Sequence, residues 1–235
     1  MRLGIITDVH NNVVALQRVV EELNKAECDY IICCGDIIGI GPYPEETVRC
    51  MMRIPNLIAV KGNHDSYIDE DMMGRDNMTM GEIMHHRWEH QMLSEESIRF
   101  LRSLPYQRDI DVEGYRISIL HYAMDGKGHF ANLVKNPSKE DLHAIFANVD
   151  SDIVLYGHEH TRNILLGDKS FVNVGSLGCP SHGGSIARAG ILAIEEGRIS
   201  IETIDLEYDV KEVLRQIDAI NYPEADNIKR FFYGV

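Results

Sequence analysis

Five short groups of carboxylate, imidazole and amide side chains, each placed directly after an apolar run, could bind metal ions. They are Asp8-Val9-His10, Gly35-Asp36, Gly62-Asn63-His64-Asp65, His121 and Gly157-His158-Glu159-His160. A mixed nitrogen and oxygen ligand set suits Mn, Fe, Zn, Co or Ni, whereas an all-oxygen set would indicate Mg or Ca. Two such metals side by side need a bridging anion, for which Asp36 is the candidate, and they support hydrolysis. The sequence therefore predicts a hydrolytic site with two divalent metal ions.

Apolar runs of strand length precede all five groups and would position them. These runs are rich in β-branched residues and cover residues 3–6, 30–34, 57–60, 117–120 and 153–156. Between the first two runs, apolar residues recur at helical spacing over 13–23, with Asn11 or Asn12 as the N-cap candidate. This strand-helix-strand unit places potential ligands at both strand exits, where loops on a rigid scaffold commonly carry functional side chains.

The rest of the chain continues an α/β pattern, which favours a single domain over residues 1–235. Residues 66–110, approximately, form a Met-rich and largely helical insertion, which we interpret as a cap over the site or as a layer that only covers the sheet. The C-terminal helix packs on its own domain or on a second subunit, so a homo-oligomer is one expected assembly. Further elements are predicted by spacing: helices over 44–52 and about 209–220, and strands over 171–174, 190–194 and 198–204, the last two as a hairpin.

The composition favours a soluble cytoplasmic protein and disfavours two kinds of partner. A formal net charge of -14 argues against duplex nucleic acid, because such binding rests on Lys and Arg. No apolar stretch approaches the roughly 18 residues of a membrane span. Met1 leads directly into a strand, so we expect neither a membrane anchor nor a signal peptide. The five cysteines include no CxxC pair, which favours free thiols in a reducing compartment.

Taken together, the motifs resemble the pattern of the calcineurin-like metallophosphoesterases, and within them the small prokaryotic YfcE-like phosphodiesterase/phosphatase group. The resemblance runs from Asp8 to about Ser176, where Asn173-Val174-Gly175-Ser176 is similar to a stretch of that group. It implies a four-layered αββα sandwich and two divalent metal ions, manganese first, with Fe, Zn, Ni or Co as alternatives. It also implies two ligand sets, namely Asp8, His10, Asp36 and His160 for one metal, and Asp36, Asn63, His121 and His158 for the other.

Other side chains are expected to act around the metals. His64 would stabilise charge on the phosphoryl oxygens or protonate the leaving oxygen, and Asp65 would orient the His64 imidazole. Tyr43 could stack on a base of the substrate and Arg188 could meet its phosphate, although a Gly/Pro turn at residues 39–44 and a surface ion pair of Arg188 are the simpler interpretations. A metal role for the histidines of the insertion is disfavoured, because no acid is expected at ligand spacing; they are His85, His86 and His90.

The sequence thus favours a metal-dependent phosphohydrolase that acts on a small phosphorylated molecule, as a phosphodiester or a phosphomonoester, nucleotide-derived substrates included. Hydroxide bridging the two metals would attack phosphorus in line with the leaving group. Two alternatives stay open: a dinucleotide polyphosphate hydrolase with the same mechanism, and a non-catalytic protein-binding module on the same fold. The pocket walls that decide the substrate are expected in residues 39–44, the insertion and residues 176–188.

Overall fold

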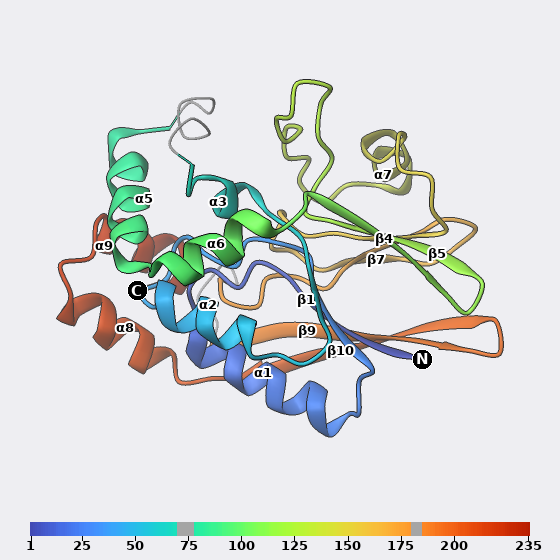
Figure 1. Cartoon of the computed structure of the whole chain (residues 1–235), viewed down its shortest axis with the longest axis horizontal. Coiled ribbons are helices and arrows are strands. Elements are labelled where there is room, and N and C mark those ends of the chain that lie inside the picture. Colours follow the sequence, from blue (N-terminus) through green and yellow to red (C-terminus); the bar gives the residue numbers. More distant parts are fainter. Residues whose placement is uncertain (70–77, 180–184) are drawn as a thin grey trace.

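The computed structural model describes residues 1–69, 78–179 and 185–235, which form two five-stranded sheets (Figure 1). Parts of the predicted insertion and of the predicted 176–188 pocket loop, residues 70–77 and 180–184, lie outside the described residues. Among the described residues, no helix has both the length and the apolar character needed to cross a bilayer.

The first sheet has the strand order β10-β9-β1-β2-β3, and its central strands β1 and β2 belong to the strand-helix-strand unit at the start of the chain. Its strands are β1 (Arg2–Ile6), β2 (Tyr30–Cys33), β3 (Leu57–Ala59), β9 (Ile186–Glu195) and β10 (Arg198–Glu207). The strands β1, β2 and β3 run parallel, and β9 pairs antiparallel with β1. Because of the parallel pairing, the segments that follow β1, β2 and β3 leave the sheet at the same edge, as the motif positions require.

The second sheet is ordered β4-β5-β6-β8-β7 and carries the later motifs. Its strands are β4 (Gln107–Val112), β5 (Tyr115–Leu120), β6 (Ile153–Leu155), β7 (Asn163–Leu165) and β8 (Ser170–Asn173). The parallel pair β5 and β6 sends His121 and Gly157 out at one edge.

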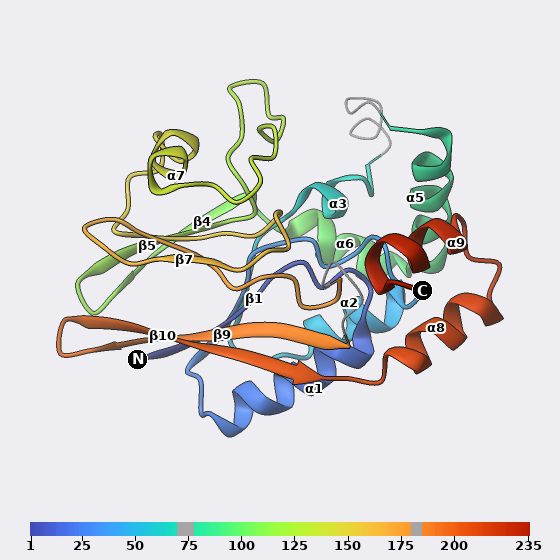
Figure 2. The ribbon, with the colours of Figure 1, turned by 180° about the vertical axis from the view of Figure 1, so that it is seen from behind.

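Helices cover the outer faces of both sheets, so the predicted four-layered αββα sandwich is confirmed (Figures 1 and 2). On the first sheet lie α1 (Val13–Lys25), α2 (Pro44–Met52), α6 (Glu95–Ser103) and α8 (Val210–Ala219), and on the second α7 (Lys139–Ile145). In the described parts of the chain, the other helices are α3 (Asn63–Ser66), α5 (Met80–Met92), α9 (Ala225–Ile228) and the π-helix η1 (Lys229–Tyr233).

Three apolar cores fill the spaces between the four layers. In β2, Ile31 and Cys33 face the helices, whereas Ile32 and the following Cys34 face the second sheet. This alternation follows from the two-residue period of a strand. Both cysteines are buried free thiols, so they act here as small apolar residues of the core.

The region predicted as an insertion over 66–110 is only partly separate from the sandwich. Within it, α6 buries Leu101 in the core beside α2, and β4 is an edge strand that pairs with β5. The prediction missed β4 because most of its side chains are exposed, and an edge strand held by backbone hydrogen bonds needs no apolar pattern. The remaining helix α5 lies over the site end of the molecule, beside α9 (Figures 1 and 2).

The C-terminal helix predicted at about 209–220 is α8, and it packs on its own domain. Its Val213 and Ile217 are buried in the same core as α1. The following α9 and η1 were not predicted, and they turn the end of the chain back toward α5 (Figure 2).

One surface carboxylate joins α2 to the start of α6 and provides a test of this packing. Glu45 accepts hydrogen bonds from the Ser94 backbone N–H at 2.9 Å and from Arg49 Nε at 2.5 Å. Burial alone would raise the pKa of Glu45, but the bonds from Ser94 and Arg49 outweigh it and hold the pKa at about 2, below the ordinary 4.5. The carboxylate therefore stabilises the fold above pH 4.5, and this contribution is lost as the pH falls toward 2.

We expect Glu45→Gln to lower the free energy of unfolding at pH 7 by roughly 1 kcal/mol, a value discounted because solvent screens a partly exposed carboxylate. Urea unfolding at pH 7 and at pH 3 should show the difference from wild type shrinking in acid. The exposed neighbour Glu46, changed to Gln, is the matched control. A deficit that is equal at both pH values would contradict this role of Glu45.

Candidate metal centre

Five of the seven predicted metal ligands have left-handed backbone conformations, with φ values of 52° for Asp8, 49° for His10, 54° for Asp36, 73° for His158 and 60° for His160. Such angles are uncommon outside glycine and persist where the surrounding structure enforces them. Backbone hydrogen bonds between the loops after β1 and β2 provide this support, from Asp8 N to Gly35 O and from His10 N to Asp36 O, each 3.0 Å. The backbone thus turns sharply at each strand exit and directs the side chains toward one another.

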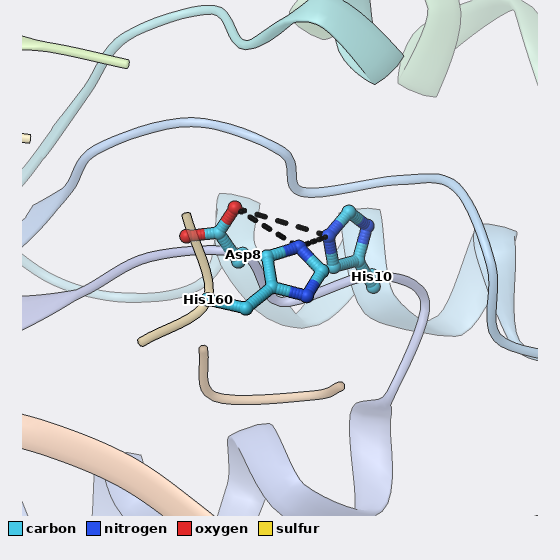
Figure 3. Close-up of side chains that lie close together, drawn as sticks. All are labelled: Asp8, His10 and His160. Atoms are coloured by element: carbon cyan, nitrogen blue, oxygen red, sulfur yellow. Dashed lines mark hydrogen bonds and ion pairs between the residues drawn. The ribbon is translucent and has the colours of Figure 1, made fainter. Parts of the chain in front are cut away.

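The first group joins the β1 exit to the Gly-His-Glu-His segment, although 150 residues separate them in the chain. Asp8, His10 and His160 each offer one ligand atom, and these atoms lie within 4.8 Å of one another. Figure 3 shows the three side chains pointing at a common centre. His10 Nε2 lies 2.9 Å from His160 Nε2, and Asp8 Oδ1 lies 3.5 Å from His160 Nε2.

A second group lies beside the first and comes from β2, β5, β6 and the start of α3. It comprises Asp36, His121 and His158, with Asn63 adjoining. His121 Nε2 lies 3.2 Å from Asp36 Oδ2, from His158 Nδ1 and from Asn63 Oδ1. Asp36 Oδ2 also lies 3.9 Å from His10 Nε2, so this carboxylate is placed between the two groups.

The hydrogen bonds of two histidines show which ring nitrogens face these centres. Nδ1 of His10 faces the Ile38 carbonyl at 3.2 Å, and Nδ1 of His121 faces the Cys34 carbonyl at 2.8 Å. A carbonyl only accepts, so both Nδ1 atoms carry a hydrogen and each ring presents its Nε2 to the cluster. Imidazole nitrogens and carboxylate oxygens that face one another at about 3 Å are held together by a shared proton or by a metal ion.

The pKa values of the two histidines differ. Burial lowers the pKa of His10 to about 4, so its ring is neutral and free to bind a metal at neutral pH. Burial also acts to lower the pKa of His121, but the negative charge of Asp36 outweighs it and the pKa is about 9. Without a metal the His121 ring is therefore protonated and pairs with Asp36, and a metal bound there would take the place of this proton.

The predicted role of Asp65 as a partner of the His64 imidazole is wrong. The Asp65 carboxylate accepts hydrogen bonds from three backbone N–H groups, those of Ile37 at 2.9 Å, Ile38 at 3.1 Å and Gly62 at 2.8 Å. It stands at the third position of α3 and turns back toward the N-cap residue Gly62, as in a capping box, which directs it away from the His64 ring. Asp65 therefore holds the loop after Asp36 in place.

His64 lies at the edge of the first group. Its ring centroid is 5.1 Å from that of His10 and 5.4 Å from that of His86, and its backbone N–H donates to Asp36 Oδ1 at 2.9 Å. Its Nδ1 is buried without a hydrogen-bond partner in the part of the chain that the structure describes. Burial lowers the pKa of His64 well below its ordinary value, so the ring is neutral.

A cavity of about 1030 Å³ opens beside the cluster. The metal-centre side of its wall includes Asn63, His64, His158 and His160. Other parts of the wall come from α5, from the loop at residues 133–136 and from the C-terminal α9 and η1, which contribute Phe231 and Phe232. The sequence interpretation missed the C-terminal contribution because nothing in the spacing of the tail shows that it folds back.

Neither of the two predicted substrate contacts lines this cavity. Tyr43 is the N-cap residue of α2 and packs on the core of the outer face of the first sheet. Burial raises its pKa, and so does the negative charge of the nearby Glu212 of α8. Arg188 lies on β9 with its Nε 3.9 Å from Asp205. The structure therefore shows Tyr43 at the start of α2 and Arg188 beside Asp205, as the simpler interpretations expect.

The expectation that the insertion histidines lack a nearby acid is also wrong. Glu89 lies three residues after His86 and four after His85, a spacing that places all three on one face of α5. The i, i+3 and i, i+4 spacing of these three residues is visible in the sequence.

Gly62 provides a test of how tightly the strand exits are packed around Asp36. A Cβ atom at this position would lie against Oδ1 of Asp36 and 2.5 Å from the Asp36 backbone N. We expect Gly62→Ala to lower the free energy of unfolding by about 1–3 kcal/mol, as overpacking does, and to weaken metal binding. Metal content after dialysis and urea unfolding measure both effects. Gly126→Ala, where an added Cβ meets nothing within 4 Å, is the control, and equal behaviour of the two variants would contradict the prediction.

The chain is similar to known proteins in both sequence and fold. The model of the Calcineurin-like phosphoesterase superfamily domain matches residues 1–197. The chain is 27% identical to the uncharacterized protein MJ0912 of Methanocaldococcus jannaschii, over 94% of each chain. It is 25% identical to the phosphodiesterase YfcE of Escherichia coli, over 82% of this chain and 87% of that one. A crystal structure of a metallophosphoesterase from Sphaerobacter thermophilus superposes with a TM-score of 0.76 at 25% identity, over 100% of this chain and 99% of that one.

Proposed function

The chain belongs to the calcineurin-like phosphoesterase superfamily, and we propose that it is a metal-dependent phosphohydrolase that cleaves a small phosphodiester. The observation that carries the proposal is the convergence of imidazole nitrogens and carboxylate oxygens around Asp36. A donor set of imidazole, carboxylate and amide fits two divalent transition metals. Manganese is our first candidate. The name of the relative YfcE supports a phosphodiester, and the free thiols support a cytoplasmic location.

The two proposed metal sites share Asp36. The ligands are Asp8, His10, Asp36 and His160 at one site, and Asp36, Asn63, His121 and His158 at the other. When bound, the metals would supply positive charge for the phosphoryl oxygens and acidify the attacking water.

The chain's own residues orient the substrate and the ligands. The His64 ring is neutral, so it donates an N–H to a phosphoryl oxygen, where negative charge grows during the reaction. The carbonyl groups of Ile38 and Cys34 hold the rings of His10 and His121, which fixes the nitrogen that faces the site. Asp65 contributes indirectly, because it anchors the loop that carries Ile38.

The cavity wall favours a substrate with little charge beyond the reacting phosphate. Among the described lining residues, Lys135 is the only Lys or Arg, whereas Glu82, Glu159 and Glu224 are acids. A dinucleotide polyphosphate would bring several further negative charges into these acidic surroundings. The described part of the wall has too few Lys and Arg side chains to match them. The apolar part of the wall, with Phe231 and Phe232, instead suits an apolar or aromatic group esterified to the phosphate.

The proposal is tested by hydrolysis of bis-p-nitrophenyl phosphate and of p-nitrophenyl phosphate by chelator-stripped protein. Mn, Fe, Zn, Ni, Co or Mg is restored singly. We expect turnover to return with a transition metal, Mn first, and to be faster on the diester. A protein that binds these metals in the expected amount and hydrolyses neither probe, nor a panel of nucleotide diesters, would overturn the enzymatic proposal and favour a binding module.

A further inference from the structure

We propose that His85, His86 and Glu89 of α5 form a further divalent-metal site, separate from the Asp36 centre. One ligand atom from each residue lies within 4.8 Å of the others. The His64 ring lies between this site and the first metal group, 5.4 Å from the His86 ring and 5.1 Å from the His10 ring, centroid to centroid. Two imidazoles and one carboxylate are a set that holds zinc or non-haem iron and leaves coordination positions open.

The spacing along α5 suits a metal. Glu89 follows His85 by four residues and His86 by three, so one helix face carries all three side chains. His86 Nδ1 lies 3.3 Å from Glu89 Oε2, close to the 3.2 Å between His121 Nε2 and Asp36 Oδ2 in the main centre. Ligand atoms that bind one metal tetrahedrally at about 2.1 Å are about 3.4 Å apart. His86 Nδ1 and Glu89 Oε2 are therefore already spaced as two ligands of one metal ion would be.

The charge balance of the site also favours a cation. Glu89 is a carboxylate of 1% exposure, and its ion-pair partner among the described residues is His86 alone. Burying a charged carboxylate is costly unless a cation or several hydrogen bonds compensate it. Two neutral donors, Asn11 and Gly39, reach Oε1 of Glu89, and Oε2 faces the His86 ring. A divalent metal held by Oε2 and the two imidazoles would complete this compensation.

The surroundings of Glu89 fix one oxygen and leave the other for a metal. Oε1 accepts from the Asn11 side-chain amide and from the Gly39 backbone N–H, both at 2.5 Å. Oε2 faces His86. Hydrogen bonds of this kind orient the ligands of metal sites. Here they tie α5 to the loops that follow β1 and β2.

His85 is held in a similar way, and the site has an entry path. Its Nε2 lies 2.8 Å from the Tyr222 hydroxyl, which donates to the Ile40 carbonyl, so Nδ1 is the ring nitrogen left for a metal. His85 and His86 both line the cavity beside the main centre. An ion and a coordinating water can therefore reach the site from that cavity.

The test counts metal ions per chain by inductively coupled plasma mass spectrometry, after loading stripped protein with Zn²⁺ or Co²⁺ and removing the excess by gel filtration. Wild type is expected to hold one equivalent more than Glu89→Gln and one more than His86→Ala. His90→Ala, which changes an exposed histidine of the same helix, should match wild type. Equal metal content in wild type and in both α5 variants would overturn the proposal.

A variant with a disabled main centre tests whether the α5 site binds metal by itself. In Asp8→Asn/Asp36→Asn, checked for folding by circular dichroism, the main centre is disabled and one equivalent should remain. Adding Glu89→Gln should remove it. A double variant that is folded and binds no metal would also overturn the proposal, in favour of a metal-free contact between Glu89 and His86.

Discussion

Asp36→Asn is expected to lower metal-dependent phosphodiester hydrolysis by at least about 100-fold. Loss of a residue that only supports a metal ligand typically costs about 10- to 100-fold, and Asp36 is itself a proposed ligand. The reason is the position of the carboxylate. Asp36 Oδ2 lies 3.2 Å from His121 Nε2 and 3.9 Å from His10 Nε2, so it faces both groups. An asparagine side chain is neutral and has a single oxygen, so it cannot bridge two cations and would present an N–H₂ group to one of them.

The measurement combines metal content with turnover of bis-p-nitrophenyl phosphate. Asp36→Asn should lose metal at the same free concentration at which wild type is saturated. Asp168→Asn makes the same chemical change at an exposed position and should behave as wild type. Full metal content and full turnover in Asp36→Asn would contradict the bridging role of this residue.

His64→Ala is expected to lower kcat by about 10²–10³-fold, the cost of removing one preorganised hydrogen-bond donor to a developing negative charge. His64 lines the cavity beside the first metal group, and burial keeps its ring neutral. The bond to the phosphoryl oxygen strengthens as charge grows, so the loss should appear in kcat with KM little changed. Steady-state kinetics on the diester probe measure this.

Metal content separates this role from the alternative in which His64 is itself a ligand. The ligand atoms of His64, His10 and Asp36 also lie within 4.8 Å of one another, so the alternative is geometrically open. The proposed role requires His64→Ala to retain the metal content of wild type, and the loss of one equivalent would refute it. His143→Ala, at an exposed position on α7, is the control for histidine removal.

Local sequence was sufficient for the elements that carry the metal ligands. The strands before Asp8, Asp36, His121 and His158 are apolar and β-branched because they lie between two packed layers, and burial on both faces leaves a continuous apolar run. The N-cap of α1 was also accessible, because Asn12 accepts from Ala15 N at 3.0 Å within a single turn. These features depend only on residues close together in the chain, so the local sequence is enough to predict them.

Local sequence does not show features that depend on backbone hydrogen bonds or on residues far apart in the chain. The edge strand β4 pairs through its backbone, so its side chains kept a polar pattern. Asp65 follows His64 directly in the chain, yet neighbouring residues of a helix point about 100° apart, and three backbone N–H groups bind the Asp65 carboxylate. Adjacency in sequence does not set the direction of a side chain.

The sequence by itself determined the class of chemistry, because residue type and strand-exit position limit what a side chain can bind. It predicted a metal-binding hydrolytic site, and the resemblance of its motifs to the calcineurin-like phosphoesterases implied the αββα sandwich that the structure has. Only the tertiary structure decided what surrounds that site: the fold-back of η1 that brings Phe231 to the cavity, the placement of Tyr43 against α8, and the contact of Glu89 with Asn11. These contacts join segments far apart in the chain, and their geometry follows from how the layers pack, which no local pattern records.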